Sequence, residues 1–333
     1  MNLEQGINAF EKLGKLLDDN KEELKRGIHN PWFTPENIDY ALTEIAASLN
    51  RKNLEKWTAM YPGLGNKKEV KKIGVITAGN IPLAGFHDFL SVLISGNIFV
   101  GKLSSKDDKL MPALIKMLID TEPNFKNFIN IKETKLENFD AVIATGSNNS
   151  ARYFDYYFGK YPHIIRKNRN SAAVLTGNET DEELQLLADD IFLYFGLGCR
   201  SISKLFLPEG YELDKIFKNS LKYKHIINHN KYANNYDYNR AIYMMNKIAF
   251  KDNGIMLMKE DIGYASPVSV VYYEYYSKLE TVKKRLNGDN EMIQCVVLKE
   301  KLVKNSINFG ESQKPQLWDY ADNIDTIEFL TNL

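Results

Sequence analysis

The chain has 333 residues, and its 43 Lys and Arg balance its 43 Asp and Glu, so the formal net charge is zero. This length predicts about two domains, and the neutral charge excludes a general attraction to nucleic acid or to an anionic membrane. The two cysteines, Cys199 and Cys295, are too few for a disulfide framework and indicate a reducing compartment, which we expect to be the cytoplasm.

The N-terminal part of the chain shows helical spacing. Charged residues interrupt the first 25 residues, which excludes the apolar core of a signal peptide. Apolar stripes predict one helix in this stretch and a second from Thr34 to Ile45. The most apolar region, 74–100, is broken by polar residues and a proline, so we expect no membrane span.

Short apolar runs then alternate with amphipathic stretches, a pattern typical of parallel βαβ units in an α/β protein. Helices are expected near 83, 109, 150 and 179, and the periodicity weakens over 218–240. Residues 326–330 predict a C-terminal strand that must pair elsewhere. The other predicted strands cover residues 74–77, 97–102, 139–144, 172–176, 203–207, 267–273 and 292–298.

Two strand-to-helix turns are candidate ligand sites, because ligands of open α/β sheets bind at strand ends. Asn80 follows the first strand, where small residues and Pro82 present its amide; the alternative is that Asn80 caps the next helix. Gly146 and Ser147 follow the strand at 139–144 and would offer backbone N–H groups to a pyrophosphate. They do not form a Gly-x-Gly-x-x-Gly fingerprint, so taken alone this turn favours a structural role.

Cys199 is the candidate nucleophile. Glycines precede it, which permits close approach of a substrate, and Arg200 follows it, which favours the reactive thiolate. The alternative role of a small buried hydrophobe suits Cys295, in an apolar run, better than Cys199. His225 and His229 are spaced i, i+4, but no second cluster of ligands accompanies them, so we expect no metal site.

In order and spacing, these segments resemble the aldehyde dehydrogenase superfamily. Residues 74–83 are similar to its strand and turn with the oxyanion asparagine, here Asn80, and residues 96–104 to its Lys-x-Ser segment. The resemblance implies a Rossmann-like cofactor domain, a second α/β domain with the nucleophile Cys199, and a C-terminal oligomerisation strand. It also implies the cofactor-binding residues Lys102, Ser104, Ser105, Gly146, Ser147 and Glu291.

A closer resemblance is to the bacterial fatty acyl-CoA reductase family of the LuxC type. It rests on residues 195–201 and on the C-terminal segments 309–313, 319–322 and 325–326, and it covers residues 30–333. It implies three parts: N-terminal helices with an NADP-binding domain (1–166), a catalytic domain (167–308), and a segment that returns to the cofactor domain or an oligomer interface (309–333).

One departure from the superfamily pattern concerns the reaction. Hydrolytic aldehyde dehydrogenases activate water with the glutamate of a Glu-Leu-Gly-Gly-Lys-Ser motif. Matching Ser171 to the motif's serine puts Arg166 at the glutamate position. A cation cannot act as a general base, and an enzyme that reduces a thioester gains from excluding activated water. The departure therefore favours acyl-CoA reduction over aldehyde oxidation.

The resemblance implies that Cys199 attacks the thioester carbonyl, with the oxyanion held by the Asn80 amide and the Cys199 backbone N–H, and that hydride transfer to the thioacyl-enzyme releases an aldehyde. NAD-preferring relatives often carry a glutamate three residues after the ribose lysine. Here that position is Ser105, and Lys106 follows it. A neutral hydroxyl and a nearby cation together tolerate the 2′-phosphate of NADPH. We therefore expect NADPH as the cofactor.

The same residues are compatible with two other functions. One is a short-chain acylating aldehyde or semialdehyde dehydrogenase, and another is a non-catalytic subunit of an acyl-transfer complex. The substrate is expected to be an acyl-CoA or an acyl-protein thioester, the assembly a homodimer formed by sheet extension, and a further partner a fatty-acid ligase or thioesterase. The aromatic runs 153–158 and 272–276 suit either an acyl tunnel or an interface, although ordinary packing is the favoured reading.

Overall fold

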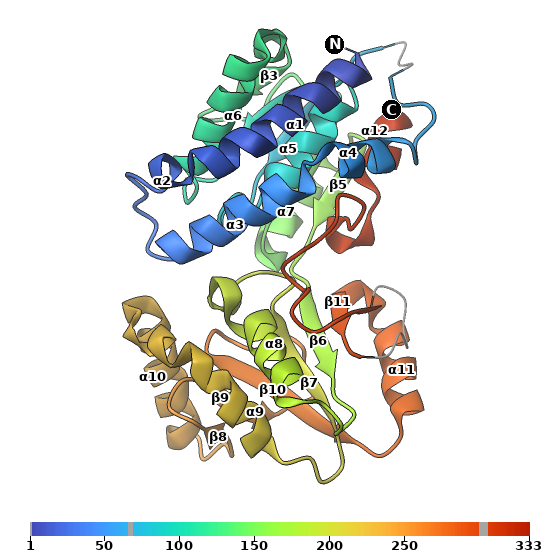
Figure 1. Ribbon diagram of the computed structural model, residues 1–333. Coiled ribbons are helices and arrows are strands. Elements are labelled where there is room, and N and C mark those ends of the chain that lie inside the picture. The colour runs from blue at the N-terminus through green and yellow to red at the C-terminus, as the bar shows by residue number, and fades with distance from the viewer. Residues whose placement is uncertain (1, 66–68, 300–305) are drawn as a thin grey trace. The chain divides into compact units, whose positions relative to one another are not determined.

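The computed structural model describes residues 2–65, 69–299 and 306–333. These residues form two compact units, each built around its own sheet (Figure 1). Unit 1 contains Met1–Lys167 and Gln316–Leu333, and unit 2 contains Asn168–Pro315. The chain returns to unit 1 at Gln316, whereas the sequence places the start of the returning segment at 309.

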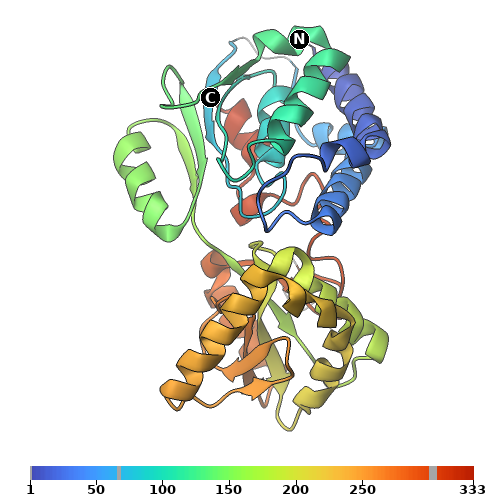
Figure 2. The same ribbon diagram turned by 90° about the vertical axis from the view of Figure 1, so that its left-hand side faces the viewer.

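Unit 1 has a five-stranded parallel sheet with the order β3-β2-β1-β4-β5. Helices α5 and α6 cover one face, and α7 covers the other (Figure 2). The winding direction reverses between the neighbours β1 and β4, so the ends of these strands form a topological switch point. The elements are β1 (Lys72–Ile76), α5 (Phe86–Ile94), β2 (Ile98–Lys102), α6 (Leu110–Thr121), η1 (Pro123–Asn127), β3 (Ile129–Ile131), β4 (Ala141–Thr145), α7 (Asn148–Phe158) and β5 (His163–Arg166).

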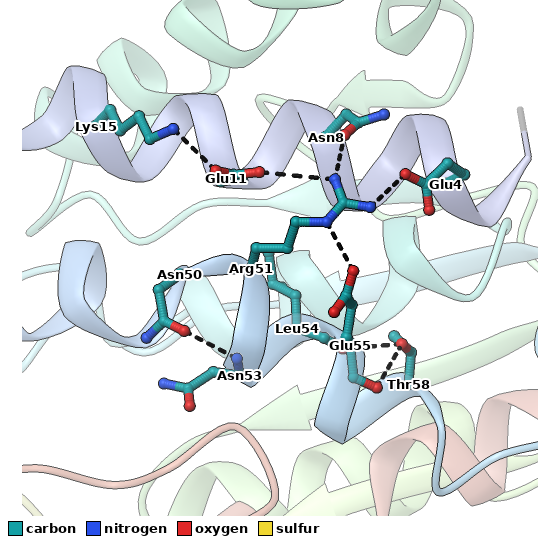
Figure 3. A network of polar contacts seen from close by, with 10 residues as sticks. All are labelled: Glu4, Asn8, Glu11, Lys15, Asn50, Arg51, Asn53, Leu54, Glu55 and Thr58. Carbon is teal, nitrogen blue, oxygen red and sulfur yellow. Dashed lines mark hydrogen bonds and ion pairs between the residues drawn. The ribbon is translucent and has the colours of Figure 1, made fainter.

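The N-terminal helices of unit 1 confirm both helices predicted there. Phe10, Leu13 and Leu17 are buried on one face of the first of them, because residues three and four apart share a helix face. Arg51 joins the fourth helix to the first through Glu4 and Asn8, at 2.5 and 2.6 Å, and it also contacts Glu55 of its own helix at 2.7 Å (Figure 3). The helices are α1 (Leu3–Asp19), α2 (Lys21–Leu24), α3 (Pro35–Ser48) and α4 (Arg51–Thr58).

Unit 2 has a seven-stranded sheet with the order β12-β11-β6-β7-β10-β9-β8, parallel except for the β8–β9 pair. The predicted strands at 172–176, 203–207, 267–273 and 292–298 are confirmed within a few residues. The strands are β6 (Asn170–Val174), β7 (Ile202–Pro208), β8 (Lys251–Asp252), β9 (Leu257–Glu260), β10 (Val270–Tyr276), β11 (Ile293–Val297) and β12 (Ser306–Ile307). The helices are α8 (Asp181–Phe192), η2 (Leu193–Gly196), α9 (Leu213–Ser220), η3 (Leu221–Asn228), α10 (Asn230–Met245), α11 (Leu279–Gly288) and η4 (Asn290–Met292).

The stretch with weak periodicity, 218–240, is helical. Tyr232, Tyr236 and Tyr243 are buried along one side of α10. The Tyr232 hydroxyl donates to the Ile255 carbonyl at 2.9 Å, which allows its ring to be buried. Because this face is built from tyrosine and asparagine rather than from aliphatic residues, the apolar periodicity is lost.

The predicted C-terminal strand is wrong: Thr326–Thr331 form a helix, α12, after the short η5 (Ala321–Asn323). The Asp325 carboxylate accepts from the Glu328 N–H at 2.9 Å and caps the helix. Ile327 and Leu330, three residues apart, are buried against the core of unit 1, whereas strand alternation would separate them. Sheet extension through residues 326–330 is therefore excluded.

Among the helices of the described ranges, none has the length and apolarity to cross a membrane.

Candidate active site

The carboxyl ends of β1 and β2 carry two loops that pack together. The Thr77 N–H donates to the Lys102 carbonyl at 3.2 Å, and the Ser104 N–H donates to Thr77 Oγ1 at 3.0 Å. Gly79 lies against Ser104, and a Cβ on this glycine would come within 2.7 Å of Ser104 Cβ. The loop that carries Asn80 and the loop that follows Lys102 are therefore positioned as one piece.

Asn80 is exposed in this loop, and the alternative that it caps the next helix is wrong, because α5 begins at Phe86 after Gly85. A buried carboxylate, Asp107, holds the loop from below: it accepts from the Leu83 N–H at 2.9 Å and from the Met111 N–H at 3.2 Å. Burial raises the pKa of Asp107. Asp107 was not predicted as a site residue, because its only local signal is an acidic residue just before a helix.

Residues suited to phosphate groups lie at the same carboxyl edge of the sheet. Lys102, Ser105 and Lys106 are exposed, and neither lysine forms a salt bridge with a described residue. Gly146 follows β4, and Ser147 caps α7 by accepting from the Ser150 N–H at 3.2 Å. Cations together with a helix N-terminus favour anionic ligands. This donor set fits the phosphates of a nicotinamide cofactor.

Arg166 ends β5 and is buried, with 3% of its surface exposed. Its Nη1 lies 2.6 Å from Asp88 Oδ2 and 3.4 Å from Thr145 Oγ1, and its Nη2 donates to Thr326 Oγ1 at 2.9 Å. Arg166 thus ties α12 to the sheet beside the turn at Gly146. Arg166, which the sequence resemblance matches to the superfamily's general base, is therefore engaged in a buried ion pair.

In unit 2, Cys199 lies at the amino end of β7 in a turn and is exposed. The Ser201 N–H donates to the Gly198 carbonyl at 3.0 Å, and Ser201 Oγ accepts from the Gly198 N–H at 3.2 Å. The Cys199 carbonyl accepts from Ser171 Oγ at 2.9 Å. The turn presents the cysteine to solvent while hydrogen bonds fix its backbone.

The C-terminal part of unit 2 supports this turn from another side. Gln313 Nε2 donates to Ser201 Oγ at 3.1 Å, and Arg200 Nε donates to the Ser312 carbonyl at 2.9 Å. The buried Asp190 carboxylate fixes this segment by accepting from the Gly310 and Ser312 N–H groups at 2.7 and 3.0 Å. Burial raises the pKa of Asp190 to about 6.

The residues just before the Cys199 turn have left-handed backbone angles. The predicted helix at 179–195 ends earlier, at Phe192, because Tyr194 and Phe195 have φ angles of 55° and 58°, and Gly196 follows with 72°. Only glycine adopts such angles without cost, and other residues lose about 1–2 kcal/mol each. Both aromatic side chains are buried, so packing offsets the strain that redirects the chain toward Cys199.

A small cavity lies within unit 2. It offers about 30 Å³ of space to water-sized molecules and is partly open to solvent. Gly196 and Ile202, on either side of the turn, contribute to its wall, together with Phe195, Tyr232 and Met256. Cys199 is not among the described residues that line it, and the space is too small for an acyl chain.

The remaining candidate residues, Cys295, Glu291 and His229, lie in or beside three different elements of unit 2. Cys295 is buried on β11, as expected of a small core residue. Glu291 is exposed in η4, directly before β11. His229 caps α10 by accepting from the Tyr232 N–H at 3.3 Å. Within the described part of the chain, no three His, Cys, Asp or Glu side chains form a group that could hold a metal ion.

Both units have the fold of the aldehyde dehydrogenases. Aldehyde dehydrogenase 21 from Physcomitrella patens, solved with succinate, aligns with all of this chain and 84% of its own, with a TM-score of 0.73 and 13% identity. A NAD-dependent benzaldehyde dehydrogenase from Corynebacterium glutamicum aligns over 89% of this chain and 76% of its own, with a TM-score of 0.68 and 13% identity. At these identities the likeness defines the fold.

The family is defined by sequence. The family model of the acyl-CoA reductases (LuxC) matches residues 10–222, which is more than half of the chain. The protein therefore belongs to the LuxC acyl-CoA reductase family, an oxidoreductase family with the aldehyde dehydrogenase fold. A search of curated protein sequences finds no match.

Proposed function

We propose that this protein reduces an acyl thioester to an aldehyde with NADPH and acts in the cytoplasm. The observation that carries the proposal is the turn of Cys199, which exposes a thiol on a hydrogen-bonded backbone in a member of the acyl-CoA reductase family. A cysteine needs only a small thiolate fraction to be an effective nucleophile.

The chain's own residues would act as follows. The Cys199 thiolate attacks the thioester carbonyl, the C–S bond to the carrier breaks, and the carrier thiolate leaves and takes a proton, which leaves an acyl group on Cys199. Donors at the oxyanion, for which the family resemblance supplies Asn80 and the Cys199 N–H, are typically worth about 3 kcal/mol each. NADPH, when bound, would supply the hydride to the carbonyl carbon of the thioacyl group; the C–S bond to Cys199 would then break, which releases the aldehyde and returns the Cys199 thiolate.

The position of Arg166 supports reduction rather than hydrolysis. Its guanidinium is buried against Asp88 and has no basic lone pair. A water that attacked the thioacyl group would therefore receive no base from this position, and the acyl group would persist until hydride transfer. Lys102, Lys106 and the N-terminus of α7 would hold the cofactor's phosphates, and Glu291 would contact a ribose.

The test is NADPH oxidation with acyl-CoAs of two to sixteen carbons and with an acyl-carrier protein, with aldehyde measured as product. Acylation is followed separately by intact-mass spectrometry without NADPH. The wild type should gain one acyl mass, and Cys199→Ala should gain none and should not turn over. A Cys199→Ala protein that still traps acyl groups would remove Cys199 from this role. Activity confined to short chains would favour a short-chain acylating dehydrogenase, and no acylation with any thioester would favour a non-catalytic subunit.

Assembly is a separate proposal. A homodimer, with a fatty-acid ligase or thioesterase as a further partner, remains the expected arrangement, although not through a strand at 326–330. Sedimentation of the purified protein gives the oligomeric state directly.

A further inference from the structure

Two irregularities of the unit 2 sheet meet at one residue. In the β6–β7 pair, Ser171 lies opposite Ile202 while Ala172 lies opposite Lys204, so Ser203 is an extra residue on β7. In the β6–β11 pair the register also shifts, between Ile293 and Val296. Bulges bend a strand and redirect side chains, and they are enriched beside active sites.

The redirected side chain is the hydroxyl of Ser171, which is fully buried. It donates to the Cys199 carbonyl at 2.9 Å. It also accepts from the Cys295 N–H at 3.2 Å and lies 3.1 Å from Cys295 Sγ. One buried hydroxyl therefore links β6 and β11 to the turn that carries the candidate nucleophile.

The bulged residue Ser203 strengthens this arrangement. Its Oγ lies within hydrogen-bond distance of the Tyr264 carbonyl, at 2.7 Å, and of the Ser171 carbonyl, at 3.4 Å. The peptide of Ser171 is thus fixed by its neighbours before its side chain reaches Cys199. Because the Ser171 backbone is already fixed, its hydroxyl can hold the Cys199 carbonyl in one orientation with little further loss of conformational entropy.

We infer that Ser171 is a positioning residue for Cys199: its hydroxyl fixes the Cys199 peptide and thereby the direction in which the thiol leaves the turn. The inference rests on the proposed nucleophilic role of Cys199. It assigns no contact with substrate to Ser171. The hydrogen bond fixes the carbonyl end of Cys199, and the bonds between Gly198 and Ser201 fix the rest of the turn, so the Cα–Cβ bond has one direction.

The experiment compares Ser171→Ala with Ser220→Ala. Ser220 is a matched control, because it is also a buried serine of unit 2 and its Oγ donates to a carbonyl, that of Phe217, at 2.8 Å. The first readout needs no substrate: the rate of Cys199 alkylation by iodoacetamide is measured against pH, with peptide mapping to assign the site. The second readout is kcat and KM with an acyl-CoA that the wild type reduces.

For Ser171→Ala we expect the alkylation profile to move to higher pH and kcat to fall about tenfold with KM within about twofold, as for an interaction that acts in the transition state. Ser220→Ala should lower only the unfolding temperature. Ser171→Thr, which retains the hydroxyl, should keep the wild-type profile even if overpacking lowers its stability. If Ser171→Ala does not fold, Ser201→Ala loosens the same turn and should show the same two changes.

Two results would overturn the inference: a Ser171→Ala profile and kcat equal to those of the wild type, or equal changes in Ser220→Ala. Failure of the proposed function is recognised separately, because a wild type that reduces no thioester still has a Cys199 alkylation profile. In that case the alkylation readout alone decides whether Ser171 positions the thiol.

Discussion

The two units present their candidate residues at opposite ends of their strands. In unit 1, Lys102 ends β2, and Asn80 and Ser147 follow the carboxyl ends of β1 and β4; the registers of these strands are unbroken. In unit 2, Cys199 and Glu291 precede the amino ends of β7 and β11, and register shifts occur on both sides of β6.

This difference has a physical cause. At the carboxyl edge of a parallel sheet the following helices point their N-termini toward the ligand, so regular βαβ geometry already provides an anion site. The amino edge has no such helix ends. Unit 2 instead fixes Cys199 with bulges, left-handed residues at Tyr194 and Phe195, and buried hydrogen bonds from Ser171. A nucleophile at this edge requires more specific support than a phosphate site does.

The strongest test of this division is Cys199→Ala. We expect kcat to fall at least about a thousandfold, because no other described group replaces the nucleophile. The dissociation constant of NADPH, measured by fluorescence of the bound nicotinamide, should stay within about twofold, since the residues proposed to bind its phosphates belong to unit 1. A large loss of NADPH affinity would show that the two roles are not divided in this way.

Arg166→Met should have the largest effect on stability. It leaves Asp88 buried without its partner at 2.6 Å, which typically costs about 3–5 kcal/mol. Urea unfolding measures the loss, and Asp88→Leu in the same chain should recover part of it. Arg51→Met, which breaks the exposed network of Figure 3, is the control and should cost much less. Equal losses would show that the pair of Arg166 has no special structural role.

Asp190 predicts a pH dependence of stability in the unit that holds Cys199. Burial raises its pKa from 3.8 to about 6, so between these values the folded protein binds a proton that the unfolded chain releases. The contribution of Asp190 to the free energy of unfolding therefore decreases as the pH rises from about 4 to about 6, by about 3 kcal/mol in total. Unfolding free energies of Asp190→Asn should lack this decrease, whereas Asp189→Asn should retain it. Parallel profiles for the wild type and Asp190→Asn would contradict the prediction.

Ser105→Glu should have the smallest effect and is confined to unit 1. A carboxylate beside the 2′-phosphate would weaken NADPH binding about tenfold, which corresponds to about 1.4 kcal/mol. NADH, which lacks this phosphate, is the internal control, and its KM should not rise. If the wild type already uses NADH and NADPH with equal efficiency, the proposed role of Ser105 and Lys106 is wrong.

The sequence by itself determined the class of fold, the strand-to-helix turns with Asn80 and Ser147, and the separation of Cys199 from Cys295. These features are local: an apolar run, a turn of small residues or a cysteine preceded by glycines can be recognised within ten residues. The helix at 326–331 was missed although its cap, Asp325, is also local, because five residues with three apolar positions suit a strand equally well.

Only the tertiary structure decided how the proposed nucleophile Cys199 is held and which residues Arg166 contacts. Ser171 reaches Cys199 across 28 positions and Cys295 across 124, and Asp190 reaches Gly310 across 120. Periodicity and propensity report which face of an element is buried, but a hydrogen bond depends on the positions of two atoms. Those positions follow from sheet order, register and bulges, which form when distant segments pack together.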